Sequence, residues 1–167
     1  MGGELAIAVL VSGQGRGTNL QALLDACASG QIAGRIAVVI GTRADAPALE
    51  RARSAGAPVV VISPRKYEGD EAGYAQALER VLKRYDIGLI CLAGYMRKLP
   101  AAIIAAYRHR ILNTHPALLP LFGGHGMYGE RVHQAVLESG MKVSGCTVHF
   151  ADEEYDTGPI VLQTAVP

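Results

Sequence analysis

The amino-acid sequence predicts an α/β fold: an open, mostly parallel twisted sheet of the Rossmann-like type, with helices on both faces and an antiparallel strand pair at the C-terminal end. Short apolar runs rich in β-branched residues alternate with helical patterns along the chain, which is typical of a parallel sheet. The run Ile87–Ala93 contains no polar side chain, which suits a central strand covered on both faces. At 167 residues, the whole chain 1–167 is expected to form a single domain.

The first half of the chain alternates strand and helix. The expected strands are Leu5–Val11, Arg35–Ile40 and Pro58–Ile62, and the expected helices cover residues 19–29, 45–56 and 70–85. Asp45 is the expected N-cap of the second helix, and Gly56 its stop. The third helix is expected to be amphipathic, with an apolar stripe of Ala75, Leu78, Val81 and Leu82.

The second half begins with the strand Ile87–Ala93. A short helix is expected to open at Pro100, because proline is favourable at the first helical position. The remaining expected elements are the strand Arg110–His115, a helix over residues 130–140, and a final antiparallel pair of strands over 145–150 and 159–166.

The composition favours a cytoplasmic protein that binds neither membrane nor nucleic acid. Sixteen basic and fifteen acidic residues leave a formal net charge of +1, which argues against a dedicated nucleic-acid surface. No apolar run has the length of a membrane-spanning helix, and no signal peptide is visible. Cys27, Cys91 and Cys146 form no Cys-x-x-Cys pair, so we expect buried small hydrophobes rather than disulfides or zinc ligands.

Polar clusters follow three of the strands at their carboxyl ends, where open α/β sheets bind ligands. They are SGQGRGTN after Leu5–Val11, GYMRKL after Ile87–Ala93, and NTHP at the end of Arg110–His115. The first is the Gly-rich loop Ser12–Asn19, SGQGRGTN, which leads into a helix. Its glycines let the backbone approach an anion, and free N–H groups at the helix start favour phosphate. The glycine spacing matches neither the dinucleotide fingerprint nor a P-loop. The residues alone leave two alternatives, a phosphate site or a plain turn with Thr18 or Asn19 as the cap.

The third cluster, NTHP, ends the strand Arg110–His115. Because side chains alternate along a strand, Asn113 and His115 share one face while Thr114 points away. Pro116 biases His115 toward an extended backbone. An amide donor beside an imidazole suits a reaction in which a carbonyl oxygen gains negative charge and a proton moves. A hydrogen-bonded structural histidine is the alternative.

The acidic turn Asp152–Pro159, DEEYDTGP, separates the last two strands. A carboxylate beside an imidazole favours the charged imidazole and fixes its orientation. Asp156 is therefore a candidate partner of a catalytic histidine, with a merely solvated turn carboxylate as the alternative.

The other histidines give weaker predictions. His125 lies in a Gly-rich loop from which it could reach a site, and His109 is expected to be exposed in a basic segment. Structural roles are expected for His133 on a helix and His149 on a strand. No set of ligands has metal-site spacing, so no metal site is expected.

Five stretches resemble, in this order, the glycinamide ribonucleotide formyltransferases within the folate-dependent formyltransferase family: SGQGRGTNLQALLDA, LAGYMRKL, ILNTHPALLP, TVHF and DTGPIVLQ. The resemblance runs from the first strand to the last residue. It implies that the cosubstrate 10-formyltetrahydrofolate gives its formyl group to the amine of glycinamide ribonucleotide in purine biosynthesis. It implies no metal, and a monomer or homodimer is expected.

The resemblance also implies roles for individual residues. Asn113, His115 and Asp156 match the catalytic triplet, and Gly17, Thr18 and Asn19 match the phosphate site. The implied folate-binding residues are Met96, Arg97, Lys98, Leu99, Asn113, Asp152 and Tyr155.

Three departures from the family pattern accompany this resemblance. The phosphate loop is longer by a Gly-Arg pair, so Arg16 is a possible added phosphate contact. An arginine that relatives place on the folate side has no match around Asp70–Gly73. Relatives continue beyond Pro167 into a C-terminal helix, so the domain is expected to be short at this end. The alternatives are a formyltetrahydrofolate deformylase and a catalytically impaired relative that binds folate or a nucleotide.

Overall fold

Seven strands form one sheet in the computed structural model, which describes residues 4–13 and 15–167. Their order is β3-β2-β1-β4-β5-β6-β7. The pairs among β1 to β5 are parallel, whereas β5–β6 and β6–β7 are antiparallel. This confirms the predicted mostly parallel sheet with an antiparallel C-terminal pair.

The elements differ from the expected ranges by a few residues at their ends. The strands are β1 (Leu5–Val11), β2 (Gly34–Gly41), β3 (Val59–Val61), β4 (Leu89–Leu92), β5 (Ile111–His115), β6 (Ser144–Phe150) and β7 (Ile160–Val166). The helices are α1 (Thr18–Ala28), α2 (Pro47–Ser54), the 3-10 turn η1 (Pro64–Tyr67), α3 (Glu71–Arg84), α4 (Ala101–Ala106) and α5 (Glu130–Glu138).

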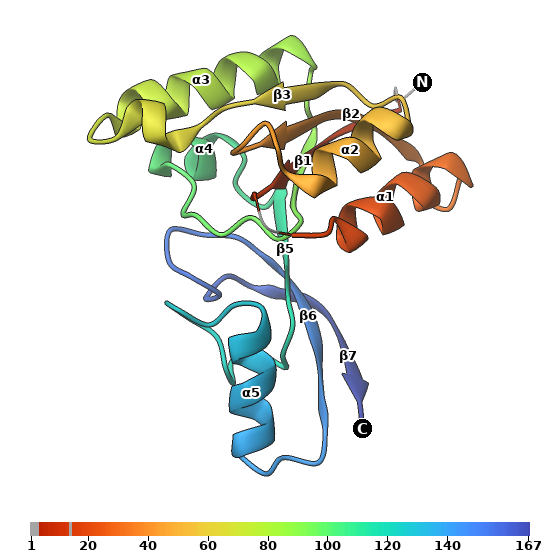
Figure 1. Ribbon diagram of the computed structural model, residues 1–167, viewed down its shortest axis with the longest axis vertical. Coiled ribbons are helices and arrows are strands. Elements are labelled where there is room, and N and C mark those ends of the chain that lie inside the picture. Colours follow the sequence, from red (N-terminus) through yellow and green to blue (C-terminus); the bar gives the residue numbers. More distant parts are fainter. Residues whose placement is uncertain (1–3, 14) are drawn as a thin grey trace.

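Helices cover both faces of the N-terminal part of the sheet (Figure 1). Alternate residues of β1 pack into two different hydrophobic cores on opposite faces of the sheet, because side chains alternate between faces along a strand. Leu10 packs in the core that contains α3 and α4, whereas Val9 and Val11 pack in the core formed with α1 and α2. Burial on both faces explains why this strand is apolar throughout.

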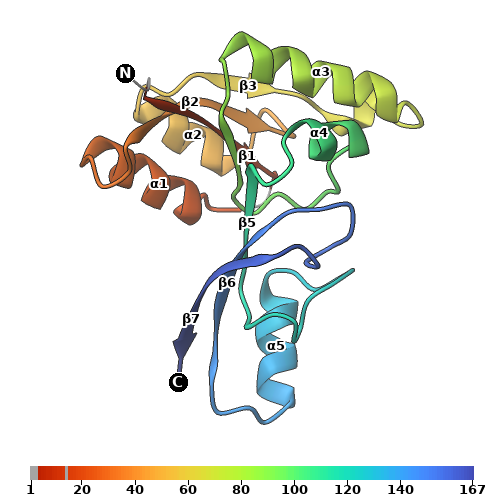
Figure 2. The ribbon, with the colours of Figure 1, turned by 180° about the vertical axis from the view of Figure 1, so that it is seen from behind.

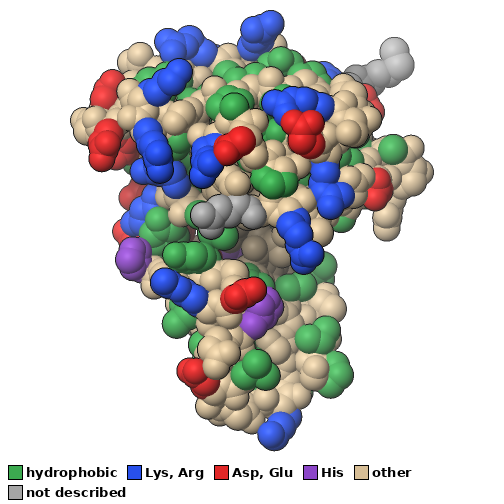
Figure 3. All heavy atoms as spheres, in the orientation of Figure 1, with side chains coloured by type: hydrophobic (Ala, Val, Ile, Leu, Met, Phe, Trp, Pro, Cys, Tyr) green, Lys and Arg blue, Asp and Glu red, His purple; other side chains and the backbone are tan. Residues whose placement is uncertain are grey.

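The C-terminal part extends away from this doubly covered half. The view from behind shows α5, β6 and β7 gathered at the other end of β5 (Figure 2). β7 is the edge strand and all its residues are exposed. Figure 3 shows the two halves as a broad body and a narrower extension, with basic side chains concentrated on the broad body in this view.

Asp45 does not cap α2. Ala46 occupies the N-cap position, and Asp45 instead accepts two hydrogen bonds from the Arg43 guanidinium, at 2.9 and 2.5 Å. A charged two-point contact is stronger than a single bond to a backbone N–H, which explains the preference. Pro100 is likewise at the N-cap position of α4 rather than the first helical position.

The cysteines are less uniformly buried than expected. Cys91 is buried in β4, whereas Cys27 and Cys146 are half-buried. Burial raises the pKa of the Cys91 thiol to about 11. Within the described ranges, no helix has the length and apolar character needed to cross a membrane.

Candidate active site

Asn113 and His115 project from the same face at the carboxyl end of β5. The antiparallel register pairs Asn113 with His149 and His115 with Thr147 across β6, so these four side chains share one face. His115 is 3% exposed, whereas Thr114 is exposed on the opposite face. The alternation predicted from the sequence is therefore confirmed.

Asp156 approaches these two residues from the turn between β6 and β7. Its carboxylate Oδ2 lies 3.5 Å from His115 Nδ1, and its Oδ1 lies 3.5 Å from Asn113 Nδ2. The backbone N–H of Gly124 also donates to Oδ2, at 3.0 Å. The structure thus brings the three predicted catalytic residues together, although 43 residues separate Asn113 from Asp156.

His149, for which the sequence predicts a structural role, is a fourth member of this cluster. Its Nε2 lies 3.0 Å from Asn113 Nδ2 and 3.5 Å from Asp156 Oδ1, and its side chain is 2% exposed. Its Nδ1 donates to the carbonyl of Phe150 at 3.0 Å, which fixes the ring. The strand register that pairs His149 with Asn113 creates this contact.

The surroundings of Asp156 keep its carboxylate ionised. Burial acts to raise the pKa of Asp156, but hydrogen bonds from His149 and Gly124 and the charges of His115 and His149 outweigh it, so the pKa lies below its usual value. The negative charge of Asp156 therefore lies 3.5 Å from a ring nitrogen of His115 and from one of His149.

Hydrogen bonds also hold His115 and the segment after it. His115 Nε2 donates to the carbonyl of Phe122 at 2.8 Å, so both ring nitrogens of a protonated His115 face acceptors. Thr147 Oγ1 donates to the carbonyl of Ala117 and accepts from the N–H of Leu119, at 2.7 and 3.0 Å. These bonds connect β6 to the chain that leaves β5 and thereby fix the direction of His115.

Gly158→Ala is expected to destabilise the fold at the turn that carries Asp156. A Cβ at this position would lie 1.8 Å from the carbonyl oxygen of Phe150, and backbone atoms cannot give way as flexible side chains do. We expect a loss of about 3 kcal/mol in the free energy of unfolding, measured by urea denaturation. Gly15→Ala is the control, because its Cβ would meet nothing within 4 Å; equal stability of the two variants would contradict the account.

The predicted phosphate residues lie at the N-terminus of α1. Gly17, rather than Thr18 or Asn19, occupies the N-cap position, in a left-handed conformation with φ 75°. A Cβ there would lie 2.9 Å from Ala48. No side chain among the described residues caps this helix, so its first N–H groups are available to an anion. Gln14, part of the same predicted loop, lies outside the described residues.

Two contacts organise this loop. Arg51 of α2 donates to the carbonyl of Arg16 at 2.6 Å, so the backbone of the inserted Gly-Arg pair is held against α2. Ser12 Oγ accepts from the N–H of Met96 at 2.9 Å. The predicted phosphate loop and the predicted folate segment are therefore joined directly, one after β1 and the other after β4.

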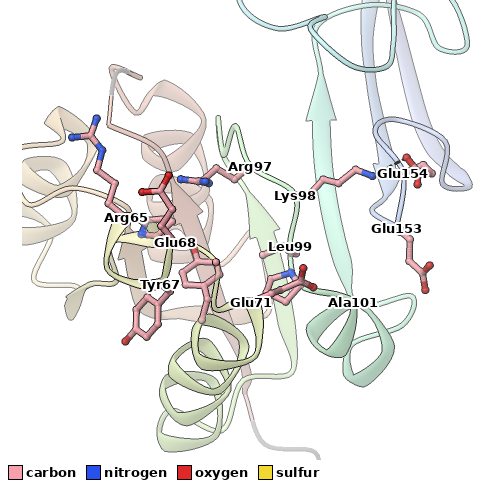
Figure 4. Close-up of a pocket in the computed structure, with 14 residues that line it drawn as sticks. Arg65, Tyr67, Glu68, Glu71, Arg97, Lys98, Leu99, Ala101, Glu153 and Glu154 are labelled. Atoms are coloured by element: carbon pink, nitrogen blue, oxygen red, sulfur yellow. Dashed lines mark hydrogen bonds and ion pairs between the residues drawn. The ribbon is translucent and has the colours of Figure 1, made fainter.

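A cavity of about 820 Å³ lies beside the folate segment and is lined in part by Arg97, Lys98 and Leu99. Its size falls in the range of small-molecule sites, about 300–1,000 Å³. Figure 4 shows Arg97 and Lys98 pointing in opposite directions, Arg97 toward η1 and Lys98 toward Glu154, with which it forms an ion pair at 2.8 Å. Leu99 is buried, and the half-exposed Met96 does not line the cavity.

Asp152 and Tyr155 lie near this cavity but do not line it. The Asp152 carboxylate is occupied within its own turn, where it accepts from Thr157 Oγ1 at 2.8 Å and from the N–H of Glu154 at 3.1 Å. The Tyr155 ring contacts His125 edge-on, with centroids 5.9 Å apart, and Lys98 lies over it at 5.4 Å. His125 thus contacts the loop that carries Asp156.

The remaining two histidines, His109 and His133, lie outside this cluster. His133 is exposed on α5, and His109 is exposed and contacts Phe150 edge-on. In the part of the chain that the structure describes, no group of three His, Cys, Asp or Glu side chains is placed to hold a metal ion.

Comparison with known proteins gives concordant matches. The model of the family described as formyl transferase matches residues 5–167. The chain is 44% identical over 160 residues to a chloroplastic phosphoribosylglycinamide formyltransferase of Arabidopsis thaliana, with 96% of this chain and 54% of that protein covered. The chain therefore spans about half the length of this relative.

Solved structures agree on the fold. The structure of glycinamide ribonucleotide transformylase 1 from Symbiobacterium toebii superposes with a TM-score of 0.88 at 48% identity, covering 98% of this chain and 73% of that one. A formyltetrahydrofolate deformylase from Pseudomonas syringae superposes with a TM-score of 0.80 at 25% identity, covering 98% of this chain and 51% of that one.

Proposed function

Because the chain belongs to the formyl transferase family, we propose that it transfers the formyl group of 10-formyltetrahydrofolate to the amine of glycinamide ribonucleotide. The products are formylglycinamide ribonucleotide and tetrahydrofolate, as in purine biosynthesis. A cytoplasmic location and a monomeric or homodimeric state stay predictions.

One observation supports this proposal most strongly. Asn113 and His115, two hydrogen-bond donors, lie side by side at a strand end, and the ionised Asp156 lies 3.5 Å from each. This arrangement suits the stabilisation of a carbonyl oxygen that becomes negative, since preorganised donors act most strongly where charge develops.

The proposed reaction conserves atoms and charge. The lone pair of the substrate amine attacks the formyl carbon, and the carbonyl π electrons move to oxygen to give a tetrahedral oxyanion. Asn113 and protonated His115 donate to that oxygen, and Asp156 stabilises the positive charge of His115. Collapse of the intermediate expels the folate nitrogen, which receives the proton lost by the attacking amine. Positioned acid–base groups of this kind contribute about 10²- to 10⁴-fold in rate.

The contact between His115 and Phe122 has a direct consequence in this scheme. His115 Nε2 donates to the Phe122 carbonyl, so this donor is occupied before substrate binds. We propose that the formyl oxygen replaces the Phe122 carbonyl as its acceptor. A small shift of the Gly123–Gly124 segment would permit the exchange and would also affect Asp156, which Gly124 holds.

The two substrates are proposed to bind on either side of this cluster. The ribonucleotide phosphate is assigned to the N-terminus of α1, with Gly17, Thr18 and Asn19. The folate is assigned to the Met96–Leu99 segment and the loop that contains Asp152 and Tyr155. The Ser12–Met96 bond supports this pairing, because it holds the two proposed subsites next to each other.

A deformylase is the second candidate, supported by the structural similarity to the Pseudomonas syringae enzyme. In that reaction water replaces the amine as the attacking group. The two functions are distinguished by the absorbance change of 10-formyltetrahydrofolate measured with and without glycinamide ribonucleotide. We expect consumption of the donor only when the acceptor is present. Equal rates without acceptor would favour the deformylase, and folate binding without any turnover would favour a catalytically impaired relative.

A further inference from the structure

The Lys98 side chain joins two segments that lie far apart in the sequence. Its Nζ is 2.8 Å from Glu154 Oε2, and 56 residues separate the two. Lys98 follows β4, whereas Glu154 belongs to the turn between β6 and β7 that also carries Asp156, and Figure 4 shows Lys98 extended toward Glu154. The same ammonium lies 5.4 Å from the centre of the Tyr155 ring. Lys98 therefore contacts two consecutive residues of this turn, one through an ion pair and the next through a cation–π interaction.

The backbone that carries Lys98 is fixed by two other contacts. The Tyr95 hydroxyl forms a buried hydrogen bond with the hydroxyl of Tyr74 on α3, at 2.6 Å. The N–H of Met96 donates to Ser12 Oγ at 2.9 Å. Because this segment is already ordered, an ion pair that starts from it costs less conformational entropy than one from a mobile loop. Lys98 is therefore a suitable anchor for the opposite turn.

The turn contains a backbone conformation that its surroundings must maintain. Asp156 has a φ of 58°, which is uncommon for residues other than glycine and persists where neighbouring structure enforces it. The N–H of Gly124 donates to the Asp156 carboxylate at 3.0 Å. Directly before Asp156, the Tyr155 ring contacts His125 edge-on and lies under the Lys98 ammonium. Lys98 thus acts on the residue next to Asp156 and not on the carboxylate itself.

The local charges favour this ion pair. The hydrogen bond to Glu154 raises the pKa of Lys98, partial desolvation acts against it, and the charge of Asp152 adds to the rise. Arg97 points the other way, toward η1 (Figure 4). An exposed ion pair alone contributes little to stability, but here it is combined with the contact to the Tyr155 ring. The two interactions together restrain the turn from the side of the folate segment.

We infer that Lys98 is a positioning residue: it holds Glu154 and Tyr155 so that the Asp156 carboxylate stays beside His115. This inference rests on the proposed function, because it takes the role of Asp156 in formyl transfer as given. It assigns the Lys98 side chain a different task from the predicted contact with folate. The ammonium is bound by the turn before a substrate arrives, and it acts through the turn rather than on the reacting atoms.

Steady-state kinetics on the full chain test this role. Lys98→Met keeps the length of the side chain but removes its charge, and we expect kcat for formyl transfer to fall about three- to tenfold. The KM for glycinamide ribonucleotide should stay unchanged, because its phosphate is assigned to the N-terminus of α1. Lys98→Arg should retain most of the rate, since a guanidinium also binds carboxylates and stacks on aromatic rings. The control Lys83→Met removes an exposed lysine from an ion pair with Glu79 on α3 and should be fully active.

A charge swap separates the ion pair from a contact with folate. Lys98→Glu alone places two carboxylates side by side and should lower kcat further than Lys98→Met. The double variant Lys98→Glu, Glu154→Lys can form the ion pair with its charges exchanged, so it should recover most of the kcat that Lys98→Glu loses. If Lys98 served folate directly, the double variant would stay as impaired as the single one.

Amide hydrogen exchange, followed by mass spectrometry, tests the same contact without turnover. Exchange in residues 152–158 should be faster in Lys98→Met than in the native protein and unchanged in Lys83→Met, while both variants should have similar free energies of unfolding in urea. Native exchange or native kcat in Lys98→Met, or a loss that the charge swap does not repair, would overturn the inference. If the native protein transferred no formyl group, the proposed function alone would fail, and the exchange measurement would still decide whether Lys98 holds the turn.

Discussion

His115→Ala is expected to lower kcat for formyl transfer by about 10²- to 10⁴-fold, the range typical of a positioned acid–base group. The imidazole is buried, and its two nitrogens face the Phe122 carbonyl and the Asp156 carboxylate. Alanine removes the charged donor from the oxyanion and leaves Asp156 without one of its partners. Steady-state kinetics at saturating donor and acceptor measure the effect.

The loss must be separated from a general loss of structure. His115→Gln retains a polar group that can donate, so it should fold and recover part of the lost rate. His133→Ala removes an exposed histidine on α5 and should leave kcat unchanged. Near-native turnover by His115→Ala would refute the proposed mechanism.

Asp156→Asn is expected to lower kcat for formyl transfer by about 10²-fold or more. The groups around this carboxylate are the Gly124 N–H, the Asn113 amide and the rings of His115 and His149. Asparagine would turn an NH₂ group toward neighbours that donate, and it would remove the charge that stabilises protonated His115. The pKa of Asp156 lies below its usual value because of these neighbours, so the native enzyme should keep this charge throughout the neutral range and lose it only in acid.

Asp86→Asn is a matched control for this substitution. Asp86 and Asp156 both adopt a left-handed backbone, with φ 50° and 58°, and asparagine tolerates that conformation. Asp86 is exposed and remote from the cluster, so Asp86→Asn should be fully active. If both variants retained full activity, the charge of Asp156 would have no part in the reaction.

The strand and helix pattern was predictable because its signals are local. Apolar runs, alternation and turn residues placed every strand, and alternation along β5 predicted that Asn113 and His115 share a face. Asp45 shows where local reasoning fails. The sequence suggests a helix cap, but the side chain has a stronger partner in Arg43, two residues earlier.

His149 was missed because its role depends on pairing between strands. It contacts Asn113 and Asp156 through the antiparallel register of β5 and β6, in which Asn113 lies opposite His149. The sequence shows a histidine on a strand but not the residue opposite it. The stretch TVHF, present in the family resemblance, was the one available signal.

The contribution of η1 to the cavity was also beyond prediction from the sequence. Arg65 lies on η1 and Arg97 follows β4, and only the order of the strands brings these two segments together. In contrast, Arg97 and Lys98 were predicted together as folate-binding residues, yet their side chains point to opposite sides of the cavity.

In the proposed reaction a nitrogen nucleophile, the amine of glycinamide ribonucleotide, receives the formyl group. The formyl carbon can be followed by NMR with 10-formyltetrahydrofolate labelled with ¹³C at that carbon. We expect the label in the formamide of formylglycinamide ribonucleotide, in an amount equal to the tetrahydrofolate formed. Label recovered as free formate in the presence of saturating acceptor would contradict it.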